Sequence, residues 1–373
     1  MSQDRPRTSA DLRLPEDARE HLVGPEVWWR DHHDWLVEKG YSLRPRYRPG
    51  WKPSWKGRTD KNPWEFEDWH LHANIILIDA VRLSDNSLVA LKQVKARFNP
   101  HEIEVAQFLY NEEHRTDPRN HTVPILDVLP VPDDPEVTVL VMPLLRRCDE
   151  PPWRTVGEIV SFLLQIFEGL RYMHELNVAH RDCMGSNIMY DPRPMYPNMY
   201  HPEDPSKTRD WKAGVKVFDR TRCPVRYYFI DFGLSRQYNP EEGPPREHPI
   251  VGGDKTVPEF QDWKGDLLDP FPTDIYYIGN MIQYTLLENY RGLDFLTPLV
   301  KDMIRDEPSK RPTIQQVVRR FDESLKPLNQ WTLRSRVVPA KEDHTLTRLL
   351  RIPHFFRTLR CVLLRRPAIP LPS

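Results

Sequence analysis

Short apolar runs separated by polar turns occupy residues 67–145, a pattern that predicts β-strands. Strands are expected at 74–83, 87–94, 123–128 and 137–142. One segment differs, because residues 101–111 show helical spacing, with Ile103, Ala106 and Leu109 on an apolar side. This part of the chain is therefore predicted to form a small sheet with one helix.

After the proline pair at 151–152 the periodicity becomes helical. Residues 156–175 carry apolar side chains close to every 3.6 positions, the spacing of a helix with one buried face. Further helices are predicted at 273–288, 296–304 and 313–325. A strand-rich part followed by a helical part predicts an α+β fold.

Residues 1–66 are predicted to form an N-terminal arm rich in tryptophan and proline, since they hold six of the chain's 11 tryptophans. Residues 43–55 show neither helical nor strand periodicity, and their prolines favour an extended path. Dense tryptophans are costly to expose, so the rings are expected to pack against the main domain; a partner-docking surface is the alternative. Residues 191–219, rich in Pro, Tyr and Asp, predict an inserted surface loop.

The segment 331–373 is predicted to be a basic amphipathic tail. From His344 onward it has no acidic residue, and six arginines alternate with Leu and Phe. Such a tail can make a peripheral contact with an anionic membrane, or its apolar residues can dock on the helical part of the chain. Pro353 is expected to interrupt any helix in this segment.

Composition narrows the classes of protein. A hydrophobic fraction of 39% with 29% charged residues is typical of a soluble globular protein, and a net charge of −1 gives no general attraction to nucleic acid. The four cysteines and 14 histidines show no metal-ligand spacing, and His114 and His121 are expected at the surface. Few cysteines, no apolar signal core and no long apolar run predict a cytoplasmic location, with the nucleus not excluded.

Two short runs carry the candidate chemistry. The first is His-Arg-Asp-Cys-Met-Gly-Ser-Asn at 180–187, and the second is Asp-Phe-Gly at 231–233, which follows an apolar strand. Phosphoryl transfer needs a carboxylate near the attacking hydroxyl and oxygen ligands for magnesium. Asp182 is the candidate for the first role, and Asn187 and Asp231 are candidates for the second.

These runs resemble the catalytic loop and the metal-binding motif of eukaryotic protein kinases. The resemblance covers roughly residues 67–330, and the N-terminal segment is weakly similar to fungal kinase-like proteins. It implies a bilobal fold with a small β-rich N-lobe at 67–145 and a larger helical C-lobe at 146–330. It also implies ATP and Mg²⁺ as cofactors and a protein as the substrate or binding partner.

The resemblance further implies roles for residues of the N-lobe and of the linker that follows it. Lys92, in Val-Ala-Leu-Lys, matches the lysine that neutralises the nucleotide phosphates, and Glu104 is the favoured helix carboxylate to hold it, with Glu102 the second choice. Met142 and Leu145 match the segment that borders adenine; the alternative is that 140–145 is an ordinary edge strand.

Three further matches favour protein kinases over small-molecule phosphotransferases. Asp274 resembles the helix aspartate that braces the catalytic loop. Glu259, in Val-Pro-Glu, resembles the end of the activation segment, and Arg311 resembles its ion-pair partner. From 231 to 259 the hydroxyl residues are few, so although Arg181 could pair with a phosphate, phosphorylation of this segment is not expected to be the main switch.

Two departures from the kinase pattern leave the level of activity open. The three glycine positions of the phosphate-covering loop fall at His70, His72 and Ile75, and Met184 replaces a lysine that steadies the transferred phosphoryl group. Electrostatic stabilisation of that kind is worth about 2.7–4 kcal/mol, or roughly 10²–10³ in rate. The predicted function is an ATP-dependent protein kinase-like phosphotransferase acting on Ser/Thr rather than Tyr. The alternatives are a pseudokinase scaffold and, behind it, small-molecule phosphotransfer.

Overall fold

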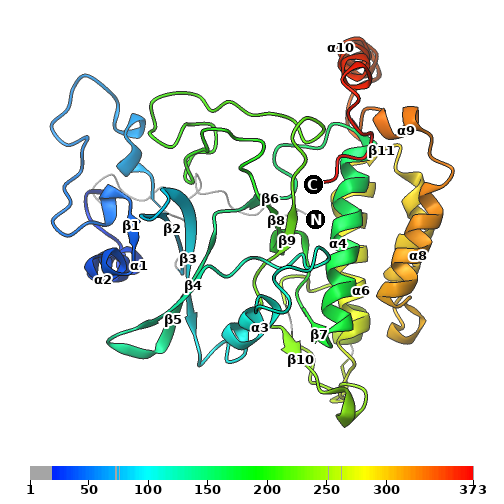
Figure 1. Ribbon diagram of the computed structural model, residues 1–373, viewed down its shortest axis with the longest axis horizontal. Coiled ribbons are helices and arrows are strands. Elements are labelled where there is room, and N and C mark those ends of the chain that lie inside the picture. The colour runs from blue at the N-terminus through cyan, green and yellow to red at the C-terminus, as the bar shows by residue number, and fades with distance from the viewer. Residues whose placement is uncertain (1–18, 72–73, 75, 251, 262, 373) are drawn as a thin grey trace. The chain divides into compact units, whose positions relative to one another are not determined.

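The computed structural model describes residues 19–71, 74, 76–250, 252–261 and 263–372 (Figure 1). The chain forms two compact units. Unit 1 contains the described residues up to Val94 together with 126–144 and 198–216. Unit 2 contains 95–125, 145–197 and the described residues from Val217 onward. Unit 1 is rich in strands and unit 2 is mainly helical, which confirms the predicted mixture of sheet and helix and is compatible with a kinase-like fold.

Unit 1 is built on a curled five-stranded sheet with the strand order β1-β2-β3-β5-β4 (Figure 1). The strands are β1 (Tyr41–Leu43), β2 (Leu77–Arg82), β3 (Ser87–Lys95), β4 (Asp127–Val131) and β5 (Asp134–Pro143). Three of the four predicted strands are confirmed with small shifts at their ends. The strand predicted at 123–128 was placed too early, because Val123 donates its backbone N–H to Phe229 of unit 2 instead.

The segment predicted as an arm supplies part of this unit's core. It forms α1 (Gly24–Asp31), α2 (His33–Glu38) and strand β1, and short 3₁₀ turns lie at Pro45–Tyr47, Pro63–Glu65 and Glu67–Trp69. Trp29 is fully buried in one apolar cluster with Leu36 of α2 and Val139 of β5. Trp29 and Trp55 are therefore buried as expected, whereas Trp64 is exposed, and the segment contributes β1 to the sheet itself.

A buried ion pair ties this N-terminal segment together. The Arg46 guanidinium is inaccessible to solvent and donates through Nε and Nη2 to the Glu26 carboxylate, at 2.7 and 3.0 Å. Its Nη1 donates to the Asp68 carbonyl at 2.9 Å, and the guanidinium lies 4.5 Å from the centroid of the Trp51 ring. The buried charge of Arg46 is thus matched by the Glu26 carboxylate and by a backbone carbonyl, as a buried ion requires.

Residues 198–216, inside the predicted insertion, also belong to unit 1. Arg44 donates to Asp79 at 2.9 Å, to Glu67 at 3.0 Å and to Glu203 of the insertion at 2.7 Å. The Trp211 indole donates to the Glu65 carbonyl at 3.0 Å. The predicted surface loop is therefore anchored by half-buried and buried charges rather than left in solvent.

Unit 2 is organised around α4 (Val156–Glu175), which has the bounds that the apolar periodicity predicted. The other helices are α3 (Glu102–Leu109), α5 (Pro258–Gln261), α6 (Phe271–Ile282), α7 (Thr297–Met303), α8 (Ile314–Leu325), α9 (Gln330–Arg334) and α10 (His344–Leu363). A π-helical turn at Gln283–Leu287 continues α6. The Thr155 hydroxyl caps the first turn of α4, and α8 packs along it.

Short strands complete unit 2. A three-stranded sheet has the order β6 (Arg146–Arg147), β8 (Ile188–Tyr190), β9 (Tyr227–Phe229). Two-stranded sheets pair β7 (Val178–Ala179) with β10 (Arg236–Gln237), and β11 (Tyr290–Arg291) with β12 (Val338–Pro339). These strands are too short for a core of their own, but they fix the ends of the loops that carry the candidate chemistry.

Two predictions about unit 2 were wrong. Pro353 does not interrupt the tail, since α10 continues through it. His114 and His121 are buried rather than at the surface. Their rings have polar partners inside unit 2: the Tyr172 hydroxyl lies 3.0 Å from His114 Nδ1, and the Tyr227 carbonyl lies 2.9 Å from His121 Nδ1. Among the helices of the described residues, none is both long and apolar enough to cross a membrane.

Replacing Arg46 by Met is expected to lower the free energy of unfolding by about 3–5 kcal/mol, because Glu26 would remain buried without its partner. Chemical denaturation followed by tryptophan fluorescence would measure the loss. Arg30→Met, on an exposed arginine of α1, is the matched control and should change stability by less than about 1 kcal/mol. Equal effects of the two variants would contradict the structural role assigned to the buried pair.

Candidate active site

The loop between β7 and β8 brings Asp182 and Asn187 together. The Asn187 amide Nδ2 donates to the Asp182 carboxylate Oδ2 and to its carbonyl, both at 2.9 Å. The other carboxylate oxygen, Oδ1, accepts a hydrogen bond from the Gly253 backbone N–H at 2.9 Å. The aspartate is therefore oriented from both sides, and the sequence spacing of five residues becomes a direct contact.

A second, fully buried aspartate holds the backbone of this loop. Asp274 of α6 accepts the backbone N–H groups of His180 and Arg181 at 2.8 and 2.7 Å, and its Oδ2 lies 3.0 Å from His174 Nε2. Burial by itself would raise the pKa of Asp274, but the hydrogen bonds from His174 and Arg181 outweigh it and lower the pKa. The predicted bracing role of Asp274 is confirmed.

Strand pairing places the second motif beside the first. Ile188 of β8 is opposite Phe229 of β9, so Asn187 and Ile230 flank the same end of this antiparallel pair, and the Ile230 N–H donates to the Asn187 carbonyl at 3.0 Å. The Ile230 carbonyl in turn lies 3.1 Å from His180 Nε2. Asp231 follows directly, with a positive φ of 65°.

This backbone conformation separates the side chains of the Asp-Phe-Gly run. Phe232 is buried against the His180 ring, at 5.4 Å between centroids, whereas Asp231 is exposed. A positive φ is costly for an aspartate unless the surroundings impose it, so the turn is fixed by the packing of Phe232 and by β9. Asp231 is therefore an exposed carboxylate one residue beyond Ile230, whose backbone bonds to Asn187.

The donor set fits a hard divalent cation. Because the Asn187 Nδ2 is used by Asp182, its side-chain oxygen is the atom left to act as a ligand, and Asp231 adds carboxylate oxygens. Within the part of the chain that the structure describes, no three His, Cys, Asp or Glu side chains form a metal-binding group. Two oxygen ligands suit Mg²⁺, which completes its shell with waters and substrate phosphates.

Two glycines, Gly252 and Gly253, let the backbone approach Asp182 closely. A β-carbon on Gly252 would lie 2.5 Å from the Asp182 carboxylate oxygen, and one on Gly253 would overlap the Met184 sulfur. Burial raises the pKa of Asp182, and the nearby charge of Asp231 raises it further, while the Gly253 N–H and Asn187 oppose the shift. At the position where the family resemblance implies a lysine, the chain thus has the Met184 thioether, and the donor beside Asp182 is the Gly253 backbone N–H.

Arg181 is paired with a carboxylate of the same unit. Its Nη1 lies 2.8 Å from Glu247, and Nη2 donates to the His248 carbonyl at 3.3 Å. Arg236 of β10 lies 3.7 Å from the same Glu247 carboxylate. Two arginines therefore share one glutamate, Glu247, in the place where the sequence suggested a phosphate.

The end of this segment is locked by the predicted ion pair. Arg311 donates to both oxygens of Glu259, at 2.8 and 2.6 Å, and Thr273 donates to the same carboxylate at 2.9 Å. Both charged side chains are almost completely buried. The bidentate geometry confirms the pairing predicted from the sequence and is the strongest form of such a contact.

The remaining candidates divide between the units. Lys92 of β3 and Met142 of β5 are buried in unit 1, and Leu145 lies at the start of a segment of unit 2. In α3 of unit 2 the Glu104 side chain is 75% exposed and its carboxylate lies 3.4 Å from His101 Nδ1. Glu102, by contrast, is 1% exposed and accepts from Asn99 at 3.1 Å.

The sequence favoured Glu104 over Glu102, but Glu102 is the buried carboxylate of α3. The prediction used Ile103 as an apolar position, but the buried residues of α3 are Glu102, Val105, Ala106 and Leu109. These follow the i, i+3, i+4, i+7 spacing of one face. That spacing was visible in the sequence and would have identified Glu102 as the buried carboxylate.

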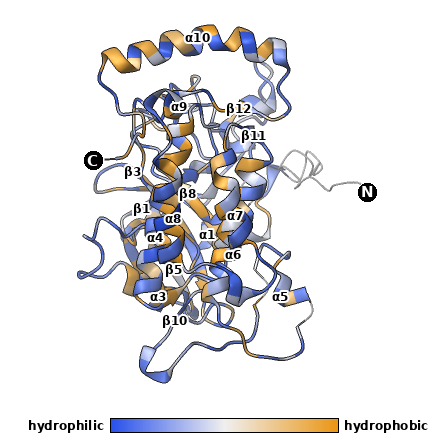
Figure 2. Ribbon diagram, turned by 90° about the vertical axis from the view of Figure 1, so that its right-hand side faces the viewer, coloured by the Kyte–Doolittle hydropathy of each residue, from blue (hydrophilic) through white to orange (hydrophobic). Residues whose placement is uncertain are grey.

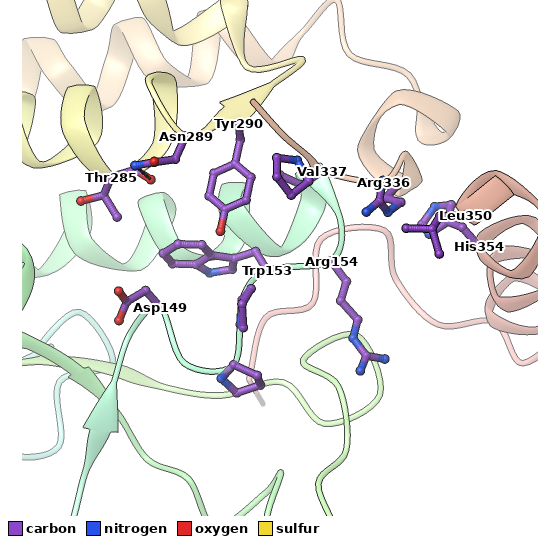
Figure 3. A pocket seen from close by; sticks show the side chains of 13 residues that line it. Asp149, Trp153, Arg154, Thr285, Asn289, Tyr290, Arg336, Val337, Leu350 and His354 are labelled. Carbon is purple, nitrogen blue, oxygen red and sulfur yellow. Dashed lines mark hydrogen bonds between the residues drawn. The ribbon is translucent and has the colours of Figure 1, made fainter. Parts of the chain in front are cut away.

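Two cavities in unit 2 differ in their relation to this site. One of about 560 Å³ adjoins the catalytic loop and is lined by Met184, Gly185 and Ser186 together with residues 253–256. The other, about 770 Å³, is lined by Trp153 and Tyr290 and reaches Leu350 and His354 of α10 (Figure 3). No residue of 180–187 lines the second cavity, so only the first is placed to receive a group that acts with Asp182.

Comparison with known proteins gives limited similarity. No family model matches the chain. Over 188 residues it is 23% identical to a candidate serine/threonine-protein kinase, R436, of Acanthamoeba polyphaga mimivirus, which covers 44% of this chain and 56% of the viral protein. Over 34 residues it is 59% identical to a protein of Encephalitozoon cuniculi named as a homolog of the serine/threonine-protein kinase MRK1, or 11% of that protein. The chain thus spans about half or less of the curated relatives it matches, and the similarity supports a kinase-like protein.

Replacing Asp274 by Asn is expected to lower the free energy of unfolding by about 3 kcal/mol at neutral pH, because two buried backbone donors and His174 lose the carboxylate. Urea denaturation of the variant, with exposed Asp322→Asn as control, would measure this loss. Since folding lowers the pKa of Asp274, its contribution is present above the ordinary carboxyl pKa and is lost as the pH falls toward the folded value. The stability gap between wild type and variant should therefore narrow in acid; a constant gap would contradict the assignment.

Proposed function

We propose that the chain is a bilobal, protein kinase-like phosphotransferase that moves the γ-phosphate of ATP to a protein hydroxyl. In this proposal the sheet of unit 1 belongs to the N-lobe, and unit 2 contains the C-lobe together with residues 95–125, which the sequence assigned to the N-lobe. The observation that supports it most directly is the hydrogen-bonded pair of Asp182 and Asn187, braced by Asp274 and placed beside Asp231. The distant similarity to proteins named as serine/threonine kinases agrees with it.

In this proposal each polar group has one task. Asp182 orients the acceptor hydroxyl and takes its proton, for which its raised pKa is suited. Asn187 and Asp231 hold Mg²⁺, which supplies charge neutralisation for the nucleotide phosphates when bound. Lys92 neutralises the α- and β-phosphates, and Met142 and Leu145 border the adenine.

Glu102, rather than Glu104, is the carboxylate that we assign to Lys92. A carboxylate that positions an ammonium has to be shielded from water to keep its orientation, and Glu102 is the buried one of the two. Glu104 is left as a solvated residue of α3. The assignment reverses the order of preference given by the sequence.

The acceptor is proposed to be Ser or Thr on a protein, and the location cytoplasmic. Turnover is expected to be slow, because Met184 provides no charge for the transferred phosphoryl group and packs on Gly253 instead. The same feature favours the second candidate, a pseudokinase that binds nucleotide without turnover. Of the three missing glycine positions, His70 lies on the surface of unit 1, and His72 and Ile75 lie outside the described residues.

Mg-ATP is expected to raise the melting temperature of the wild-type chain, and Asp231→Ala should abolish the Mg²⁺-dependent part of that rise, because it removes a metal ligand. At a ligand concentration of about 100 Kd the stabilisation is about 2.7 kcal/mol. Exposed Asp266→Ala is the matched control. Autophosphorylation with labelled ATP, lost in Asp182→Asn, separates the two candidates: binding without turnover selects the pseudokinase, and no thermal response to ATP in wild type rejects both.

Glu247 is proposed to act as a permanent substitute for an activating phosphate, since it already forms ion pairs with Arg181 and Arg236. Glu247→Ala is expected to lower phosphotransfer about tenfold, because a charge-assisted contact worth roughly 1.5–3 kcal/mol is lost. Glu242→Ala, an exposed glutamate of the same segment, should leave the rate unchanged. Phosphatase treatment should also have no effect; a large rate increase on phosphorylation, abolished by Tyr238→Phe, would refute this.

A further inference from the structure

The solvent-exposed face of α10 is apolar, whereas the face that packs on the rest of unit 2 is polar. Leu349, Ile352, Phe356, Leu359 and Leu363 follow one another at spacings of three or four residues and therefore share one face. These five side chains are 42–73% exposed. A helix that packs on a protein core normally turns such a face inward. The apolar face of α10 is instead exposed and open to a binding partner.

The face of α10 that is turned toward unit 2 is polar. Thr347, Thr358 and Cys361 are buried there, and Arg357 lies 3.1 Å from Asp219 and 3.4 Å from Glu158. Beneath the helix is the cavity of about 770 Å³, with Leu350 and His354 of α10 at its edge (Figure 3). The predicted alternative, in which the apolar residues dock on the helical part, is therefore wrong.

Both ends of α10 are anchored, so the exposed face is a fixed feature. The Asp343 carboxylate caps the first turn by accepting from the backbone N–H of Thr345 at 2.7 Å. Beyond the helix the chain returns to unit 2, where Arg334 donates to the Arg366 carbonyl and Ser161 donates to the Pro370 carbonyl, both at 2.6 Å. Figure 2 shows α10 lying across the ends of the neighbouring elements of unit 2, with hydrophobic segments along its length.

The charges around this face have one sign. Arg348, Arg351, Arg360 and Arg365 are exposed on α10 and just after it, and residues 344–372 contain no Asp or Glu. A second copy of the chain would bring these arginines against their own counterparts without a carboxylate from either helix. A surface with negative charges above an apolar interior complements both properties at once.

We infer that α10 binds the surface of an anionic membrane, with its apolar face inserted among the lipid chains and its arginines on the phosphate groups. The helix lies in the plane of the interface, because its own arginines prevent it from entering the apolar interior completely. This inference does not depend on the proposed phosphotransfer activity, since no residue of the candidate active site takes part.

The test uses the full chain and sedimentation with vesicles of phosphatidylcholine alone or with added phosphatidylserine. Wild type should bind the phosphatidylserine vesicles, and less tightly as the salt concentration rises. Leu349→Asp with Phe356→Asp should reduce binding at least tenfold. Arg348→Glu with Arg351→Glu should reduce it by more than about 25-fold, since each basic residue near such a surface contributes roughly fivefold.

Exposed Phe98→Asp in unit 2 is the matched control, because it changes an exposed phenylalanine outside α10 and should leave binding unchanged. All the altered side chains are exposed, so the melting temperatures should stay close to that of wild type. Failure of wild type to bind phosphatidylserine vesicles would overturn the inference. A dimer that dissociates in the Leu349→Asp, Phe356→Asp variant, without lipid binding, would show instead that the face joins two copies.

Discussion

The candidate active site depends on one buried carboxylate. Asp274 lies on helix α6, and its two carboxylate oxygens accept hydrogen bonds from the backbone N–H groups of His180 and Arg181 in the 180–187 loop. Arg181 has a positive φ of 67°, a conformation that an arginine adopts only when something else compensates for it. The two hydrogen bonds supply that compensation, and the direction of Asp182 and Asn187 follows from it.

Around this loop, backbone groups and carboxylates of unit 2 contact the charged side chains at 181 and 182. The Gly253 N–H donates to Asp182, and Glu247 neutralises Arg181. The first contact needs a close approach of the backbone, which a side chain at Gly252 would prevent. The second needs a carboxylate that is partly shielded from water, and Glu247 is partly buried.

The outer segments of the chain are also structural parts rather than simple appendages. The N-terminal segment places Trp29 in the core of unit 1, and residues 198–216 bring Glu203 to Arg44. Helix α10 tolerates Pro353 inside it, although an internal proline costs about 3 kcal/mol, because contacts at both ends hold the segment in place. In each case contacts distant in sequence outweigh the local preference.

The sequence alone determined the long helix α4, the pairing of Glu259 with Arg311, and strands β2, β3 and β5, because these rest on local periodicity or on motifs of fixed spacing. Only the tertiary structure decided where β4 begins and which way α10 faces. Those outcomes depend on what lies opposite each residue. The backbone N–H of Val123 donates to the Phe229 carbonyl, so Val123 is not part of β4. In α10, Arg357 lies near the carboxylates of Glu158 and Asp219, whereas Phe356 is exposed. Periodicity identifies a face of a helix, but the direction of that face is set by partners that the local sequence does not contain.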